Sequence, residues 1–210
     1  MNSRTEKILL QGAAGAIEVL RDPAADGTPA LGVAVISHPH PLFGGSMDNK
    51  VVQTLARAFV ACGWTAVRFN FRGVGASEGV HDEGRGEFED MLSVIGQVAP
   101  EAPLAIAGFS FGAFVASRVI ERLATSRDIR HIVLVGTAAA RFSVAPVPPE
   151  WHERTLVVHG EQDDTVPLAA VMDWARPQTL PVTVVPGGGH FFHGQLPLLK
   201  NLVVRHLRAG

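Results

Sequence analysis

The sequence predicts an α/β fold built on a mostly parallel, twisted sheet of about seven to eight strands. Short apolar runs alternate with longer runs of helical spacing, which is the pattern of strand–helix–strand units with helices on both faces of the sheet. Hydrophobic residues make up 47% of the 210 residues and charged residues only 18%, as expected for a chain that buries a globular core. The length suits one domain over residues 1–210.

The predicted strands begin with a hairpin-like pair. Residues 7–10 and 16–20 are short alternating runs on either side of a glycine-rich tetrapeptide, which is typical of two paired strands. Six later apolar runs have the length of strands, and the first of them is of the kind buried on both faces of a sheet. They lie at residues 31–37, 64–71, 104–109, 129–135, 155–158 and 182–185.

Helices are predicted between and after these strands. Val51, Leu55 and Phe59 share one face at helical spacing, which predicts a helix over residues 50–61. Four further helices are predicted over residues 88–98, 113–123, 168–175 and 196–207. The only longer irregular stretch late in the chain, residues 136–154, is too short to form a substantial cap. We therefore expect a minimal cap or none.

Charge and cysteine content limit which partners and which cellular compartment we expect. A net charge near -2 gives no electrostatic basis for binding nucleic acid or an anionic membrane, so we expect neither as a partner. Cys62 is the only cysteine, and no intramolecular disulfide can form. Residues 1–7 lack the apolar core of a signal peptide, and no apolar run approaches the roughly 20 residues of a membrane-spanning helix. We expect a cytoplasmic protein.

A serine lies at the turn between the predicted strand 104–109 and the predicted helix 113–123. Residues 108–112 read Gly-Phe-Ser-Phe-Gly, which has the form of a nucleophile elbow. In such a turn a Cβ at either flanking position would clash with neighbouring backbone, and the serine is strained with its hydroxyl exposed. The pattern predicts Ser110 as a nucleophile.

A second segment of the chain has the same spacing. Residues 75–79 read Gly-Ala-Ser-Glu-Gly, but three residues separate them from the predicted strand over 64–71. The polar, glycine-rich residues 80–86 follow, which favours a loop over an immediate helix. We therefore predict that Ser77 is a turn residue.

Candidate partners of Ser110 follow two later strands. A serine hydroxyl needs a base, and the base needs an orienting carboxylate. The loop after residues 155–158 carries three acidic residues, and the loop after residues 182–185 carries His190 and His193. Because the carboxyl ends of parallel strands meet at one edge of a sheet, we expect these loops to lie near Ser110.

Further motifs complete a characteristic set. Residues 38–45 read His-Pro-His-Pro-Leu-Phe-Gly-Gly, and residues 70–75 read Asn-Phe-Arg-Gly-Val-Gly. Together with the elbow, His-Gly-Glu-Gln-Asp at 159–163 and Gly-His-Phe-Phe at 189–192, they resemble the α/β-hydrolase superfamily. The nearest resemblance is to its small, cap-less, dienelactone-hydrolase-like members. It runs from about residue 30 to the C-terminus, implies an α/β-hydrolase fold, and says little about the substrate.

The resemblance implies roles for the residues around Ser110. The superfamily pattern Gly-x-x-Asp-x-x-Val fits residues 160–166 and selects Asp163 as the acid over Glu161 and Asp164. His190 ends the glycine-rich turn and matches the position of the base. The order serine, acid, histidine is the order of the superfamily.

Other polar residues receive structural interpretations. Asp164 and Thr165 lie where a helix N-cap is needed before Pro167. His193 is interpreted as a neighbour of the base at the start of the last helix. Four further histidines are interpreted as structural or surface residues: His81, His131, His152 and His206.

Two backbone N–H groups are the expected oxyanion donors. One belongs to Phe111, directly after the nucleophile. Aligning residues 38–40 with the His-Gly-x turn of the superfamily indicates the N–H of His40 as the second. Pro39 and Pro41 have no N–H, which narrows the choice.

These residues predict a serine hydrolase that cleaves a carboxylic ester or a similar acyl substrate through an acyl-enzyme. Ser110 attacks the carbonyl, His190 takes its proton and Asp163 holds the imidazole, so neither a cofactor nor a metal is needed. With so little chain for a cap, we expect an open, shallow pocket for a small-molecule acyl substrate. Six aromatic residues are candidates to line it, although each suits the core equally well: Phe43, Phe109, Phe111, Phe142, Phe191 and Trp151.

Other functions compete with this interpretation. His38 and His40 have a spacing found in binuclear metal sites, and Asp163 and Asp164 offer further ligands for a metal-dependent hydrolase, although the usual downstream Asp-His pair is absent. A non-catalytic binding module on a hydrolase fold is the second alternative, but it has no need of all three triad residues. Nucleotide binding is disfavoured because Glu78 interrupts a Gly-x-Gly-x-x-Gly pattern.

Overall fold

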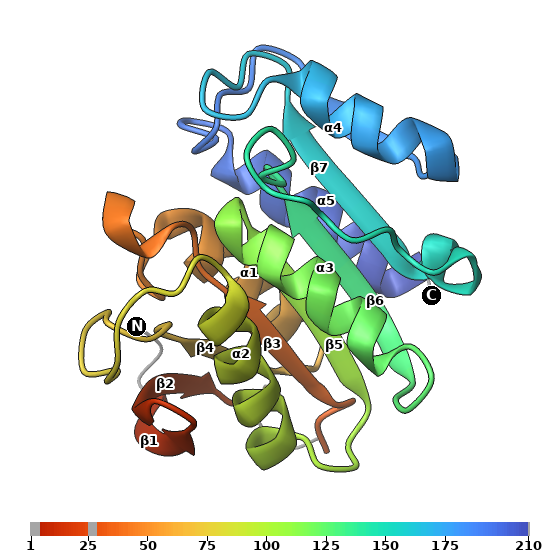
Figure 1. Cartoon of the computed structure of the whole chain (residues 1–210). Helices are drawn as coiled ribbons and strands as arrows, with labels where there is room; N and C mark the ends of the chain where they lie inside the picture. Colours follow the sequence, from red (N-terminus) through yellow and green to blue (C-terminus); the bar gives the residue numbers. More distant parts are fainter. Residues whose placement is uncertain (1–4, 25–28, 210) are drawn as a thin grey trace.

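Eight strands form one sheet in the computed structural model, which describes residues 5–24 and 29–209 (Figure 1). Their order across the sheet is β1-β2-β4-β3-β5-β6-β7-β8. The strands are β1 (Glu6–Gly12), β2 (Gly15–Asp22), β3 (Val33–Ser37), β4 (Thr65–Phe69), β5 (Leu104–Phe109), β6 (Ile129–Val135), β7 (Thr155–Gly160) and β8 (Val182–Val185). Only the β1–β2 and β2–β4 pairings are antiparallel, so the mostly parallel sheet and its initial hairpin are confirmed.

Helices connect the strands at the predicted points of the chain. They are α1 (Lys50–Ala61), α2 (Arg85–Val98), α3 (Phe111–Leu123), α4 (Leu168–Ala175) and α5 (Leu196–Ala209), with short 3-10 turns η1 (Pro41–Phe43), η2 (Pro149–Arg154) and η3 (Arg176–Gln178). α2 begins three residues earlier than predicted, because the side chain of Glu87 accepts the N–H of Gly84 at 2.8 Å and caps the first turn. No helix within the described residues is long and apolar enough to cross a membrane.

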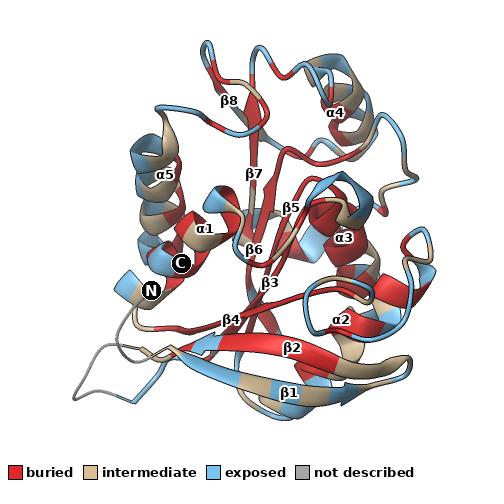
Figure 2. Ribbon diagram, turned by 90° about the vertical axis from the view of Figure 1, so that its left-hand side faces the viewer, coloured by how far each residue is buried: buried red, intermediate tan, exposed pale blue. Residues whose placement is uncertain are grey.

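The sheet separates two apolar cores. α1 and α5 cover one face, while α2, α3 and α4 cover the other (Figures 1 and 2). β5 contributes to both cores, because successive side chains of a strand point to opposite faces. Leu104 and Ile106 belong to the core under α3, whereas Ala105, Ala107 and Phe109 belong to the core under α1.

The direction of chain travel reverses at β3, which lies between β4 and β5. In open parallel sheets, ligands bind outside the carboxyl ends of the strands at such a switch point. The loops after β3 and β5 carry His40 and Ser110, and the loops after β7 and β8 carry Asp163 and His190. The topology therefore brings all the predicted site residues to one edge of the sheet.

No helical cap covers this edge within residues 5–24 and 29–209. The connection from β6 to β7, residues 136–154, is irregular except for η2 at its end. The prediction of a minimal cap or none is confirmed.

The turn around Ser110 requires glycine on both sides. A Cβ on Gly108 would lie 2.5 Å from the carbonyl oxygen of Gly112, and one on Gly112 would lie 2.6 Å from the carbonyl oxygens of Ser37 and His38. Backbone atoms cannot rotate away from such a contact as a flexible side chain can. Ser110 itself has a φ of 58°, a conformation that residues with a Cβ rarely adopt. The predicted steric requirement is confirmed.

Gly112→Ala should lower the free energy of unfolding by about 1–3 kcal/mol, because the added methyl group forces the start of α3 away from the end of β3. Urea denaturation measures the loss. Gly96→Ala is the matched control, since Gly96 is exposed in α2 and its added methyl group meets no atom within 4 Å. That variant should gain up to about 1 kcal/mol. Wild-type stability in Gly112→Ala would contradict the close backbone approach.

Candidate active site

Ser110 lies directly between β5 and α3, as the elbow pattern predicts. Its N–H donates to the carbonyl oxygen of Val135 at 2.9 Å, and its carbonyl oxygen accepts the N–H of Ala113 at 3.0 Å. These bonds hold the backbone in its strained conformation. Only 7% of the residue is exposed, and it lines a pocket.

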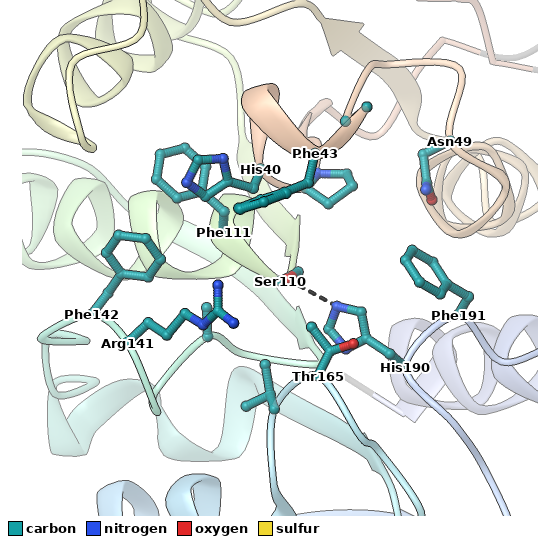
Figure 3. Close-up of a pocket in the computed structure, with 15 residues that line it drawn as sticks. His40, Phe43, Asn49, Ser110, Phe111, Arg141, Phe142, Thr165, His190 and Phe191 are labelled. Carbon is teal, nitrogen blue, oxygen red and sulfur yellow. Dashed lines mark hydrogen bonds between the residues drawn. The ribbon is translucent and has the colours of Figure 1, made fainter.

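Ser110, His190 and Asp163 form one chain of hydrogen bonds. The hydroxyl of Ser110 donates to Nε2 of His190 at 3.0 Å (Figure 3). Nδ1 of His190 donates to Oδ2 of Asp163 at 2.7 Å. Because an ionised carboxylate can only accept, Asp163 fixes the ring proton on Nδ1 and leaves Nε2 free to take the serine proton.

Asp163 is buried but keeps its charge. Burial alone would raise its pKa, but hydrogen bonds from His190 and from the N–H of Val166 outweigh that effect and hold the pKa below its usual value. Oδ1 accepts the N–H groups of Thr165 at 3.0 Å and of Val166 at 2.7 Å. Nε2 of the buried His159 lies 3.5 Å from Oδ2 and donates to the carbonyl oxygen of Val166 at 2.9 Å. The carboxylate is therefore fixed at both oxygens.

The other two acids of this loop bond elsewhere. Glu161 and Asp164 are both exposed. A carboxylate oxygen of Glu161 accepts the N–H of Gly187 at 2.8 Å, and one of Asp164 accepts the hydroxyl of Thr165 at 3.3 Å. Asp163, which the superfamily pattern selects, is the acid of this loop that hydrogen-bonds His190.

The prediction that Asp164 and Thr165 cap the next helix is wrong. The N-cap of α4 is Pro167, and it forms no side-chain capping bond. The physical reason is that Asp163 already accepts the N–H groups of Thr165 and Val166, so a side-chain-stabilised turn is complete before α4 begins.

The two predicted oxyanion donors belong to residues that line the same pocket as Ser110. Phe111 is the first residue of α3, where an N–H has no acceptor within the helix. The carbonyl oxygen of His40 accepts the N–H groups of Phe43 and Gly45, each at 3.1 Å, which fixes the loop after β3. Within the described part of the chain, the N–H groups of Phe111 and His40 donate to no protein acceptor. Two unpaired donors beside the serine are what an oxyanion site requires.

Ser77 is a turn residue whose hydroxyl bonds to backbone groups. Its N–H donates to the carbonyl oxygen of Val74 at 3.0 Å, which closes a turn. Its hydroxyl donates to the carbonyl oxygen of Asn70 at 2.7 Å and accepts the N–H of Glu18 at 2.9 Å. These bonds link the loop after β4 to β2, so the structural interpretation of Ser77 is confirmed.

The histidines proposed as metal ligands use three of their four ring nitrogens within the protein. His38 is fully buried; Nδ1 donates to the carbonyl oxygen of Pro39 at 2.6 Å, and Nε2 accepts the N–H of Phe71 at 3.0 Å. Nδ1 of His40 accepts the N–H of Leu42 at 3.2 Å. Among the described residues, no three His, Cys, Asp or Glu side chains cluster as metal ligands. The residues present therefore do not fit the metal site that the spacing suggested.

His81, interpreted from the sequence as a structural or surface residue, lies beside the site. His81 donates through Nδ1 to a carboxylate oxygen of the fully buried Glu87 at 2.7 Å. Its ring centroid is 4.7 Å from that of His40 and 5.5 Å from that of Phe111. Nothing in the polar residues 80–86 indicates these contacts, because they depend on how α2 packs against the loop after β3.

The remaining histidines have structural or surface positions, as predicted. His131 is buried with its ring against Trp64, at a centroid distance of 5.5 Å. His152 and His206 each hydrogen-bond a backbone carbonyl oxygen. His193 is exposed and precedes α5.

A pocket of about 320 Å³ opens at Ser110, with walls from the loops after five strands (Figure 3). Four of the predicted aromatic residues line it: Phe43, Phe111, Phe142 and Phe191. The other two belong to the core: Phe109 is fully buried under the ring of His190 at 4.9 Å between centroids, and Trp151 is buried with the residues under α3. Phe43 is 75% exposed at the rim, so the pocket opens to solvent as expected.

Three polar residues of the pocket were not indicated by the sequence. Asn49 is the N-cap of α1, and Thr165 lies in the turn that Asp163 stabilises. Arg141 comes from the irregular residues 136–154, where no motif marks it. Each enters the pocket because of tertiary packing alone.

Comparison with known proteins accords with this geometry. A family model described as "Hydrolase_4: Serine aminopeptidase, S33" matches residues 42–156, which include Ser110. The chain belongs to the α/β-hydrolase superfamily. Two solved structures that match nearly the whole chain are described as an α/β serine hydrolase and an α/β serine hydrolase homologue.

The hydrolase is similar to the α/β serine hydrolase without lid from Xanthomonas campestris, with a TM-score of 0.86 and 33% identity over 100% of this chain and 96% of that chain. It is also similar to an α/β serine hydrolase homologue from Coxiella burnetii, with a TM-score of 0.81 and 38% identity over 96% of this chain and 97% of that chain. An uncharacterized protein of Rickettsia prowazekii is 31% identical over 79% of this chain and 74% of its own length. The predicted α/β-hydrolase fold is confirmed.

Acid should destabilise the hydrolase between about pH 6.5 and pH 4 through His38. Burial lowers the pKa of His38 to about 4. Between about pH 6.5 and pH 4 the unfolded chain therefore binds a proton at His38 that the folded chain does not bind. The stabilisation is complete above the unfolded pKa near 6.5 and is lost as the pH falls toward 4. Urea unfolding measures the free energy of unfolding at each pH in this window. The slope of that free energy against pH should be smaller in His38→Asn by about 1.4 kcal/mol per pH unit.

The control for this measurement is His193→Asn, which replaces an exposed histidine and should leave the slope unchanged. Equal slopes in wild type and His38→Asn would mean that His38 takes up its proton equally well in the folded and unfolded chains.

Proposed function

We propose that the hydrolase cleaves carboxylic esters through an acyl-enzyme formed on Ser110. The observation that carries this proposal is the chain of hydrogen bonds at the pocket, with 3.0 Å from the Ser110 hydroxyl to His190 and 2.7 Å from His190 to Asp163. A strained, nearly buried serine with a base and an orienting carboxylate in this order suits nucleophilic catalysis.

Acylation begins with attack of the Ser110 oxygen on the ester carbonyl carbon. Nε2 of His190 takes the hydroxyl proton, and ionised Asp163 stabilises the resulting imidazolium. The carbonyl oxygen becomes an oxyanion, to which the N–H groups of Phe111 and His40 donate. When the intermediate collapses, the alkoxy oxygen leaves and receives the proton from His190, which releases the alcohol.

Deacylation repeats these steps with water. His190 takes a proton from a water molecule that attacks the acyl carbon, and the same two N–H groups bind the second oxyanion. Collapse returns the proton to Ser110 and releases the carboxylic acid. The two half-reactions together consume one water molecule for each ester and need no cofactor.

The pocket favours small esters. At about 320 Å³ it lies at the small end of ligand sites, and no helical cap within the described residues extends it. The substrate we propose is a small-molecule ester with a short acyl chain. The likeness to dienelactone hydrolases and the cytoplasmic location stay predictions from the sequence.

A peptide with a free amino terminus is the competing substrate, because the matching family model is described as a serine aminopeptidase. A protonated amino group is normally bound by a carboxylate. None of the described residues that line the pocket is Asp or Glu, and Arg141 adds a positive charge. The charge of the pocket therefore favours an ester without a cationic group.

Ser110→Ala should lower kcat/KM for 4-nitrophenyl acetate and butyrate by at least about a thousandfold, because the nucleophile is lost. Release of 4-nitrophenol measures the rate. Ser77→Ala is the matched control, since it removes the serine of the second Gly-x-Ser-x-Gly segment. At a temperature where both variants are folded, Ser77→Ala should retain the wild-type value.

Two results would contradict the proposal. Hydrolysis by Ser110→Ala at the wild-type rate would exclude Ser110 as the nucleophile. A wild-type protein inactive on every 4-nitrophenyl ester from acetate to octanoate would favour the non-catalytic binding module.

A further inference from the structure

The pocket at Ser110 carries one permanent charge, the guanidinium of Arg141. No other described residue of its lining is Asp, Glu, Lys or Arg. Across residues 5–24 and 29–209, the side chain of Arg141 forms no hydrogen bond and no ion pair; its recorded contact is with an aromatic ring. Its five N–H donors are therefore open to a ligand.

The guanidinium points into the pocket. Figure 3 shows Arg141 reaching from the loop after β6 toward Ser110, on the side opposite Phe191 and Asn49. The guanidinium carbon lies 6.0 Å from the ring centroid of Phe43. Such a cation–π contact restrains the charge beside the serine, but it leaves the N–H donors unpaired.

The backbone that carries Arg141 is held by the residue next to it. The ring of Phe142 stacks on that of Phe114 at 4.7 Å between centroids and contacts Phe111 at 5.3 Å. The N–H of Arg141 donates to the carbonyl oxygen of Ala138 at 3.3 Å. The arginine therefore extends from a fixed point of the pocket wall and not from a loose loop.

The charge of Arg141 acts on the loop that carries the second oxyanion donor. Burial lowers the pKa of His40, and the neighbouring His81 and Arg141 lower it further, while Glu87 opposes them. Beside Ser110, the lining of the pocket presents the positive charge of Arg141. An anionic group of a ligand is attracted to it, and a cationic group is repelled.

We propose that Arg141 binds a carboxylate of the substrate, so that the ester cleaved at Ser110 carries a negative charge close to its scissile bond. The inference rests on the proposed function and narrows its substrate class. A planar guanidinium pairs with both oxygens of a carboxylate, which adds orientation to attraction. Arg141 is then the residue that selects anionic over neutral esters.

Two pairs of esters test the proposal, and the members of each pair differ by one charge. Mono-4-nitrophenyl adipate and its methyl ester differ in the acyl part; 4-acetoxybenzoate and its methyl ester differ in the alcohol part. Wild type should have the higher kcat/KM for the anionic member of at least one pair. Arg141→Gln should lower that anionic-to-neutral ratio by about tenfold.

Two further variants separate this effect from a general loss of charge. Arg141→Lys keeps the charge without the planar fork and should retain part of the preference. Arg205→Gln removes an exposed arginine of α5 outside the pocket and should leave the ratio unchanged. Equal ratios in wild type and Arg141→Gln for both pairs overturn the proposal.

Binding measurements keep the inference independent of turnover. Calorimetry of the same four esters with Ser110→Ala should show tighter binding of an anionic member, and adding Arg141→Gln should abolish the difference. If wild type cleaves none of the esters, the proposed function fails, but this difference in binding still supports the role of Arg141. Equal binding of anionic and neutral members in both pairs overturns the inference alone.

Discussion

The site depends on the close approach of two backbone segments. The start of α3 lies against the end of β3, with Gly112 in contact with the carbonyl groups of Ser37 and His38. The hydroxyl of Ser37 lies 2.9 Å from the carbonyl oxygen of Gly112 and 3.2 Å from that of Ala107. It therefore links the end of β3 to the start of α3 and to β5. Because no side chain separates the segments, the serine turn and the loop that carries His40 meet at one pocket. The strain at Ser110 persists because this packing holds it in place.

Asp163 and His190 are positioned by a different kind of constraint. Asp163 lies in a turn that its own side chain stabilises, with two N–H groups on one oxygen and His190 on the other. Nε2 of His159 donates to the carbonyl oxygen of Val166 and so stabilises the same turn. The imidazole of His190 rests on the ring of Phe109. Hydrogen bonding thus fixes the carboxylate and aromatic packing fixes the imidazole, so the proton acceptor faces Ser110 before any substrate binds.

Features set by local chemistry could be predicted from the sequence, and features set by tertiary packing could not. The elbow was predictable because glycine spacing reports backbone sterics directly. The cap of α4 was misjudged because Asp163 takes the N–H groups that Asp164 was expected to cap. Strand alternation places Phe109 with Ala105 and Ala107, away from the pocket, which the motif alone did not reveal. Arg141 and His81 reach the site from irregular segments, where no periodicity records which way a side chain points.

Covalent labelling identifies which serine acts as the nucleophile. The hydrolase is incubated with a fluorophosphonate, which phosphonylates activated serines, and the modified peptide is identified by mass spectrometry. We predict one adduct, on the peptide that contains Ser110, with loss of ester hydrolysis in proportion to labelling. An adduct on Ser77, or full labelling of Ser110→Ala, would contradict the account.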